Sequence, residues 1–175
     1  MNEIVKISDE MIAKSKMGRR LENKNIVLTG AAGSIGRFIT RQLLSEGAWV
    51  MMTGRDIDKL NQFVDLLEEE GFDRSRMLVA AGDGADPEVC RRIVAQAVDA
   101  AGSIDVLVNN AGAAGPKFTL RDIPFTEAEM RAVNADQTMF DSAMNLLGAP
   151  WNMVRAATPF MSDGASIINI STSFQ

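Results

Sequence analysis

The 175-residue chain contains no histidine, no tyrosine and a single cysteine, Cys90. Without histidine, no histidine-based metal site, catalytic triad or histidine acid–base pair is possible, and we expect no metal. A single cysteine cannot form an internal disulfide, which favours a reducing compartment, so we expect a cytoplasmic protein. The sequence has no long apolar run, so we expect neither a signal peptide nor a membrane span.

The overall composition is that of an ordinary globular domain. Apolar residues make up 46% of the chain, which is enough for a core, and the length suits one domain. The formal net charge is -5. An acidic balance argues against a nucleic-acid surface, because such surfaces need a basic stripe. We therefore expect a small-molecule site rather than a nucleic acid or a membrane as the partner.

Apolar runs alternate with segments of helical periodicity from residue 25 onward. Strands are expected at 25–29, 48–53, 77–81, 104–108 and 165–170, and helices at 34–46, 56–70 and 87–101. In the first helix, the periodicity places Ile35, Phe38, Ile39 and Leu43 on the inward face. Alternating strands and helices with short connections predict an α/β fold with a doubly wound parallel sheet, of the Rossmann type, truncated after the fifth strand. Residues 1–24 are expected to form an arm outside this sheet, and residues 25–175 the nucleotide-binding domain.

The segment Thr29-Gly30-Ala31-Ala32-Gly33-Ser34-Ile35-Gly36 follows the first strand and opens the first helix. In that setting a glycine-rich turn can bind a pyrophosphate at the helix N-terminus. Gly30 would allow the tight turn, Gly33 would let the backbone approach phosphate, and Gly36 would let the helix pack closely on the strand. The alternative is a plain turn, which would not need three glycines. The candidate cofactor contacts are Gly30, Ala32, Gly33, Ser34, Ile35 and Gly36.

Arg55 comes directly after the second strand, where a dinucleotide fold meets the adenosine ribose. An acidic residue there would bind the 2′-hydroxyl, whereas an arginine accommodates a 2′-phosphate. We therefore expect NADP(H) rather than NAD(H). Asp56 is interpreted as the N-cap of the next helix. The alternative for Arg55 is a solvated surface charge.

Polar and small residues also end the third and fourth strands. Asp83 and Gly84 follow the third strand, where the carboxylate can accept from the adenine amino group, although both residues also suit an ordinary turn. After the fourth strand, asparagine side chains can tie neighbouring strand ends together, while Ala111 and Gly112 leave room for a ribose. Asn110, Ala111 and Gly112 are therefore further candidate cofactor contacts. The alternative is a purely structural role for the asparagines.

Taken in order, these motifs resemble those of the short-chain dehydrogenase/reductase family. The likeness continues through Asn145-Leu146-Leu147-Gly148, Pro159-Phe160-Met161 and Ile168-Asn169-Ile170-Ser171-Thr172, so it extends from about Leu21 to the end of the sequence. One departure is Ser34, which stands where the commonest glycine turn of the family has glycine. The resemblance implies NADP(H)-dependent reduction of a small-molecule carbonyl substrate to an alcohol by hydride transfer.

Three segments further resemble the amino-terminal reductase part of bacterial bifunctional malonyl-CoA reductases: 120–129, 145–148 and 168–174, together with the long insert between the first two. This resemblance implies reduction of malonate semialdehyde to 3-hydroxypropionate within a larger polypeptide. Two alternatives stay open. One is a generic short-chain reductase of another aldehyde or ketone, and the other is a non-catalytic nucleotide-binding or scaffolding module.

The resemblance also implies catalytic roles. In the family a tyrosine protonates the carbonyl oxygen, a nearby lysine lowers its pKa, a hydroxyl orients the carbonyl and an asparagine anchors a water. By position in the motifs, Asn145 is that asparagine and Thr172 the hydroxyl, with Ser171 as the alternative. The tyrosine and lysine would lie beyond Gln175. We therefore expect the 175 residues by themselves to bind nucleotide but not to catalyse the reaction.

A sheet that ends at its fifth strand would keep an open edge and an uncovered apolar face. Such surfaces invite association. We therefore expect the chain to be part of a larger polypeptide, or to pack on a partner such as a second copy in a homo-oligomer.

Overall fold

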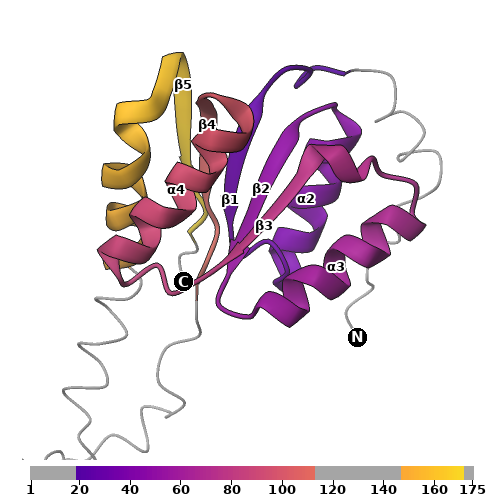
Figure 1. Ribbon diagram of the computed structural model, residues 1–175, viewed down its shortest axis with the longest axis horizontal. Coiled ribbons are helices and arrows are strands. Elements are labelled where there is room, and N and C mark those ends of the chain that lie inside the picture. The colour runs from indigo at the N-terminus through magenta and orange to yellow at the C-terminus, as the bar shows by residue number, and fades with distance from the viewer. Residues whose placement is uncertain (1–18, 113–146, 172–175) are drawn as a thin grey trace, which may run out of the picture.

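A five-stranded parallel sheet organises residues 19–112 and 147–171, which are the residues that this computed structural model describes (Figure 1). Its strands are β1 (Asn25–Thr29), β2 (Trp49–Gly54), β3 (Met77–Ala81), β4 (Ile104–Asn109) and β5 (Met161–Asn169). The helices are α2 (Ser34–Ser45), α3 (Ile57–Glu69) and α4 (Pro87–Ala101), and residues 147–157 are also helical. The strand order is β3-β2-β1-β4-β5, which confirms the doubly wound α/β fold.

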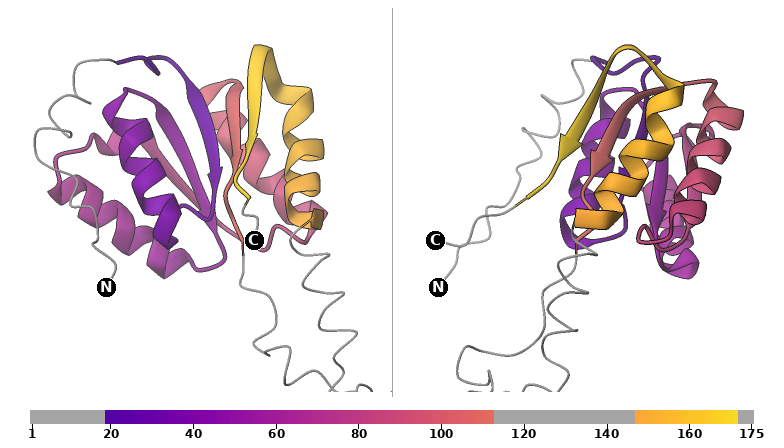
Figure 2. Two further views of the ribbon diagram at one scale, coloured as in Figure 1. Left: turned by 180° about the vertical axis from the view of Figure 1, so that it is seen from behind. Right: turned by 90° about the vertical axis from the view of Figure 1, so that its left-hand side faces the viewer.

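Helices cover both faces of the sheet (Figures 1 and 2). On one face, α2 and α3 pack over a core that includes Leu44, Phe63 and Leu67. On the other face, α4 and the helix 147–157 contribute Cys90, Met153 and their neighbours to a second core. Burial on both faces explains why the central strands read as continuous apolar runs rather than as an alternating pattern.

Helix boundaries follow local chemistry, as the sequence predicted for Asp56. The side chain of Asp56 accepts a hydrogen bond from the Lys59 backbone N–H at 3.0 Å and caps α3. Asp86 caps α4 in the same way, with Pro87 as its first residue. Gly71 follows the end of α3 with a φ of +89°, a conformation that favours glycine.

The predicted inward face of α2 is wrong at two positions. Ile35 is 59% exposed and Phe38 is 63% exposed. The buried positions of α2 are Gly36, Thr40 and Leu44, and the partly buried ones are Ile39 and Leu43. A stripe of smaller residues faces the sheet because the helix packs very closely there. The prediction considered only large apolar residues, so it placed the buried face of α2 at the wrong angle around the helix axis.

Strand β5 begins four residues earlier than predicted, because an irregularity joins its two halves. Ile104 pairs with Met161, whereas Val106 pairs with Ser166, so β5 carries extra residues relative to β4. Gly164 lies within this stretch with a φ of +79°.

Strand β5 is an edge strand, because it pairs with β4 alone among the described strands (Figure 2). The strand at the other edge is β3. Its residues 167 and 168 point to opposite faces, since side chains alternate along a strand. Both are isoleucines, with exposed fractions of 41% and 45%. Apolar surface is therefore exposed on both faces of β5.

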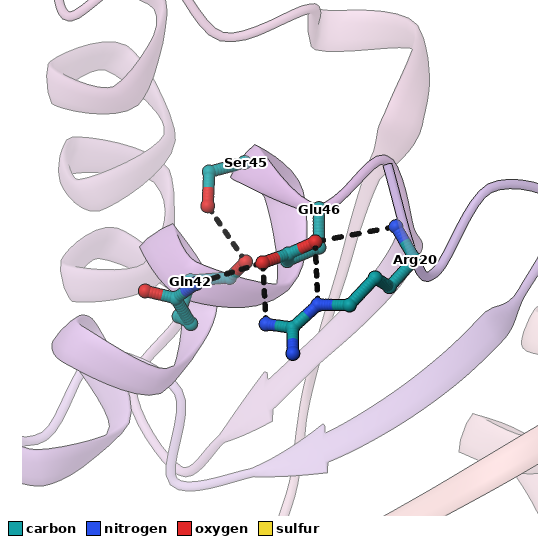
Figure 3. A network of polar contacts seen from close by, with 4 residues as sticks. All are labelled: Arg20, Gln42, Ser45 and Glu46. Atoms are coloured by element: carbon teal, nitrogen blue, oxygen red, sulfur yellow. Dashed lines mark hydrogen bonds and ion pairs between the residues drawn. The ribbon is translucent and has the colours of Figure 1, made fainter. Parts of the chain in front are cut away.

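Glu46 joins the segment before β1 to the end of α2 (Figure 3). Its carboxylate accepts hydrogen bonds from Nε and Nη2 of Arg20 at 3.1 and 2.6 Å, and from the Arg20 backbone N–H at 3.2 Å. Gln42 donates a further bond at 3.3 Å. A carboxylate at a helix C-terminus is unfavourable by itself, and the Arg20 guanidinium offsets this. The hydrogen bonds from Arg20 lower the pKa of Glu46 from its ordinary value of 4.5.

We expect Glu46→Gln to lower the melting temperature at neutral pH, because it removes the charge while keeping the shape of the side chain. The pKa of Glu46 in the folded chain lies below 4.5. Its contribution to stability is therefore complete above that pH and is lost as the pH falls further. Thermal unfolding monitored against pH should show the two proteins converging in acid. Glu69→Gln, at an exposed position, is the control, and a difference that does not depend on pH would contradict this account.

Candidate functional site

The carboxyl ends of β1 and β4 lie side by side at the centre of the sheet. Strand β1 pairs with β2 on one side and with β4 on the other, so the order of strands reverses there. In open α/β sheets, ligands bind in the crevice outside the carboxyl ends of the strands at such a reversal. The glycine turn follows β1 at this point, and residues 110–112 follow β4.

Thr29 joins the two strand ends. Its buried hydroxyl accepts hydrogen bonds from the backbone N–H groups of Asn110 and Ala111, at 3.0 and 2.9 Å, and donates to the Val108 carbonyl at 3.4 Å. The Asn110 amide donates back to the carbonyls of Thr29 and Gly30, at 3.0 and 3.2 Å. Asn110 therefore ties the strand ends together, as predicted for the asparagine side chains, and its role as a cofactor contact stays a prediction.

Two glycines allow the close packing around this turn. Gly30 has a φ of +68°, and a Cβ there would lie 2.9 Å from the Cα of Ala111. At Gly36, a Cβ would lie 2.1 Å from the Gly30 carbonyl oxygen. Side chains at either position would push apart the helix and the two strand ends. The backbone of the glycine turn is therefore not covered by side chains at Gly30 or Gly36, and it faces the carboxyl edge of the sheet.

The N-terminus of α2 differs from those of α3 and α4. No side chain caps it, and its N-cap is Gly33. Asp56 and Asp86 cap the other two helices through hydrogen bonds to backbone N–H groups. The first N–H groups of α2 therefore keep their hydrogen-bonding capacity, and the positive end of the helix dipole points toward the crevice. This arrangement suits a phosphate group.

Ala32, Ser34 and Ile35 complete the candidate set in this turn. Ala32 is buried, and its carbonyl accepts a hydrogen bond from Arg37 Nε at 3.1 Å. Ser34 and Ile35 are exposed at the start of α2. The turn therefore presents a hydroxyl and an apolar side chain next to its open backbone.

Arg55 is exposed immediately after β2, at the same edge of the sheet. The neighbouring carbonyl of Gly54 accepts a hydrogen bond from the Gly82 N–H at 2.8 Å. This bond places the loop after β3 beside Arg55. A cationic group and the β3 loop thus lie next to each other on the side of the sheet away from β4.

The loop after β3 is shaped by Asp83. One oxygen of its carboxylate accepts the Ala85 N–H at 3.0 Å, and its carbonyl accepts the Asp86 N–H at 3.1 Å. Asp83 therefore performs the turn chemistry that was the alternative to adenine recognition. Its side chain is exposed, so the second carboxylate oxygen remains accessible. The two roles are compatible.

The residues expected to carry catalysis are only partly described. Ser171 is exposed two residues beyond β5, at the same edge of the sheet as the glycine turn. Asn169 and Asn109 pair across β5 and β4, with 2.9 Å between Nδ2 of Asn109 and Oδ1 of Asn169. Thr172 and Asn145 lie outside the described residues. The catalytic roles of Ser171, Thr172 and Asn145 remain predictions.

Cys90 is fully buried, as its place in the apolar pattern of α4 indicated. Burial raises the pKa of the Cys90 thiol to about 11, so the thiol is protonated at neutral pH. It donates to the Gly84 carbonyl at 3.3 Å. The hydrogen bonds of Asn152 and Thr29 join parts of the chain that are distant in sequence, and local sequence patterns gave no signal for them.

Two negative findings concern the described residues alone. Within 19–112 and 147–171, no cluster of three His, Cys, Asp or Glu side chains is placed to hold a metal ion. In the same residues no helix has both the length and the hydrophobicity needed to cross a membrane.

Comparison with known proteins points to one family. The model of the short chain dehydrogenase family matches residues 24–174. A 7alpha-hydroxysteroid dehydrogenase of Bacteroides fragilis is 33% identical over 156 residues, covering 87% of this chain and 55% of the relative. An uncharacterized oxidoreductase of Bacillus subtilis is 28% identical over 91% of this chain and 51% of its own length. The chain thus spans about half the length of these relatives.

Solved structures agree with this result. The N-domain of a bacterial malonyl-CoA reductase, crystallised with NADP, is 41% identical with a TM-score of 0.75, over 89% of this chain and 29% of that chain. A short chain dehydrogenase from Burkholderia cenocepacia in complex with NADP is 26% identical with a TM-score of 0.67, over 86% of this chain and 56% of that one.

We expect Gly36→Ala to destabilise the fold by roughly 1–3 kcal/mol or more, because the added Cβ would meet a backbone oxygen that cannot move freely. Chemical denaturation would measure the loss. Gly148→Ala is the matched control, since a Cβ at Gly148 meets nothing within 4 Å. That helical substitution should be neutral or stabilising by about 0.5–1 kcal/mol. Similar free energies of unfolding for both variants would show that the packing at Gly36 is not tight.

Proposed function

The chain belongs to the short-chain dehydrogenase family of NAD(P)-dependent oxidoreductases, and we propose that it forms the NADP(H)-binding part of a carbonyl reductase. The observation that carries this proposal is the uncapped N-terminus of α2, which follows the Gly30 turn at the central reversal of the sheet. That position is where a Rossmann fold holds a pyrophosphate. The residues present fit the group, because the backbone is open and no acidic side chain caps this helix.

The rest of the dinucleotide would extend over residues at the same edge of the sheet. On the β2 and β3 side, Arg55 would donate hydrogen bonds to the 2′-phosphate, and Asp83 would accept one from the adenine amino group. On the β4 side, Ala111 and Gly112 would lie against the nicotinamide ribose, where a Cβ at Gly112 would meet nothing within 4 Å. The choice of NADP(H) is supported by Arg55 and by the two NADP-bound structures that the chain resembles.

We expect Arg55→Ala to weaken NADPH binding by about 10- to 100-fold, because a hydrogen bond to a charged group contributes roughly 1.5–3 kcal/mol. NADH lacks the 2′-phosphate, so its affinity should change little. Titration of the fluorescence of each reduced nucleotide would measure both affinities. Arg155→Ala removes an exposed arginine on the helix 147–157 and is the control. Equal losses for NADPH and NADH, or tighter binding of NADH by the unmodified chain, would overturn the role of Arg55.

The reaction we propose is reduction of a carbonyl to an alcohol. NADPH, when bound, would supply the hydride. The hydroxyl of Thr172, or that of Ser171, would orient the carbonyl oxygen, and Asn145 would anchor a water that relays protons. The 175 residues contain no tyrosine. A tyrosine acid would therefore have to come from sequence outside them, so the complete reaction is proposed for the whole protein only.

As the substrate we propose malonate semialdehyde, reduced to 3-hydroxypropionate. The support is the 41% identity over 89% of this chain with the N-domain of a malonyl-CoA reductase. A second candidate is reduction of a different ketone or aldehyde, which is favoured by the 33% identity with a hydroxysteroid dehydrogenase. The third candidate is a module that binds nucleotide without catalysis, and turnover by the complete protein would decide against it.

We expect the complete protein to reduce malonate semialdehyde with NADPH at a kcat/KM at least about tenfold above its values for cyclic ketones and unbranched aldehydes without a carboxylate. Oxidation of NADPH, followed by absorbance, would measure each rate. The 175 residues alone should bind NADPH without turnover. Comparable rates across the panel would favour the generic reductase. Nucleotide binding with no turnover by the complete protein would favour the non-catalytic module.

A further inference from the structure

The loop after β3 is held by side chains from two helices. Asn152, on the helix 147–157, donates from Nδ2 to the carbonyls of Gly84 and Ala85, at 3.2 and 3.1 Å. Cys90, on α4, donates to the same Gly84 carbonyl at 3.3 Å. The two lone pairs of that oxygen are thus used by donors from two different helices.

Close packing supports these hydrogen bonds. A Cβ at Gly84 would lie 3.1 Å from the Cβ of Ala149, so the loop backbone lies directly against the helix 147–157. A Cβ at Gly82 would lie 2.2 Å from a methyl group of Val89. Glycine at both positions therefore lets the loop sit between α4 and the helix 147–157.

The turn formed by Asp83 does not by itself place the loop relative to the sheet. One Asp83 oxygen is used within the loop, by the Ala85 N–H at 3.0 Å. The direction of the exposed second oxygen of Asp83 depends on the position of the loop backbone. Asn152 fixes that backbone at two points, because its side chain donates hydrogen bonds to the carbonyls of residues 84 and 85.

We propose that Asn152 is a positioning residue for recognition of the cofactor's adenine: by holding the Gly84 and Ala85 carbonyls, it directs the free oxygen of Asp83 toward the adenine amino group. This inference rests on the proposed NADP(H) function. Asn152 touches neither cofactor nor substrate, and it acts through the loop. Cys90 assists through its single bond to Gly84, and its thiol keeps the proton that this bond needs.

The test compares NADPH with its hypoxanthine analogue, in which an oxo group replaces the adenine amino group. In the unmodified full chain, we expect NADPH to bind about ten times more tightly, because the analogue places an oxo acceptor where the adenine amino group would donate to Asp83. Asn152→Leu removes both hydrogen bonds to the loop carbonyls while keeping a similar side-chain volume. It should weaken NADPH binding by about tenfold and leave the analogue nearly unchanged, so that the preference for NADPH disappears.

The matched control is Gln96→Leu, which removes an exposed amide on α4 away from this loop and should leave both affinities unchanged. Melting temperatures would confirm that each variant folds. If Asn152→Leu does not fold, Cys90→Ala and Cys90→Ser provide the second comparison. The alanine variant should lose part of the preference for NADPH, and the serine variant, which keeps a donor, should retain it.

Equal weakening of both nucleotides by Asn152→Leu, or no weakening of either, would overturn the positioning role while leaving the proposed function intact. If the Asn152→Leu variant is unfolded, an unchanged preference in Cys90→Ala would overturn it. Failure of the unmodified chain to bind NADPH at all would overturn the proposed function and this inference together.

Discussion

The hydrogen bonds of the Thr29 hydroxyl are the constraint on which the site depends. This one buried group uses its donor and both acceptor positions, and all three bonds go to the segment at the end of β4. The bonds hold Ala111 against Gly30, and only a glycine at position 30 permits that approach. The start of α2 is thereby fixed relative to the ends of β1 and β4, and so is the direction of its free backbone N–H groups.

The opposite edge of the sheet is held by carboxylates rather than by a hydroxyl. Glu46 binds the backbone and side chain of Arg20, and Asp105 accepts bonds from the Asn25 N–H, the Lys24 ammonium and the Ser162 hydroxyl. These bonds secure the entry to β1 and the start of β5. These two carboxylates therefore act at the edge of the sheet opposite the glycine turn. At the turn itself, the N-terminus of α2 has no side-chain cap.

Much of the fold could be predicted from the sequence because its signals are local. The caps at Asp56 and Asp86 and the glycine turn each act within a few residues. The prediction went wrong where packing reverses a local preference. Gly36 and Thr40 face the sheet although neither is a large apolar residue. Strand β5 extends back to Met161, because the irregularity around Gly164 lies inside the strand and does not end it.

The candidate site was predictable to the extent that its motifs are contiguous. The glycine turn and residues 110–112 are each uninterrupted in the sequence. By contrast, the bond from Asn152 to the Gly84 carbonyl joins residues 68 positions apart. Nothing in the neighbourhood of either residue indicates that they meet, because only the topology of the sheet brings the two helices and the loop together.

The position of β5 has a consequence for the order of assembly. Strands β1, β2 and β4 each lie between two neighbours, whereas β3 and β5 each have one described neighbour, and β5 also exposes an isoleucine on each face. A strand with one neighbour has fewer bonds to break on leaving the sheet than a strand between two. The amide hydrogens of β5 should therefore exchange with solvent sooner than those of β1, β2 and β4. In a folding chain, β5 should join the sheet after β1 and β4 have paired and the turn at Gly30 has already formed.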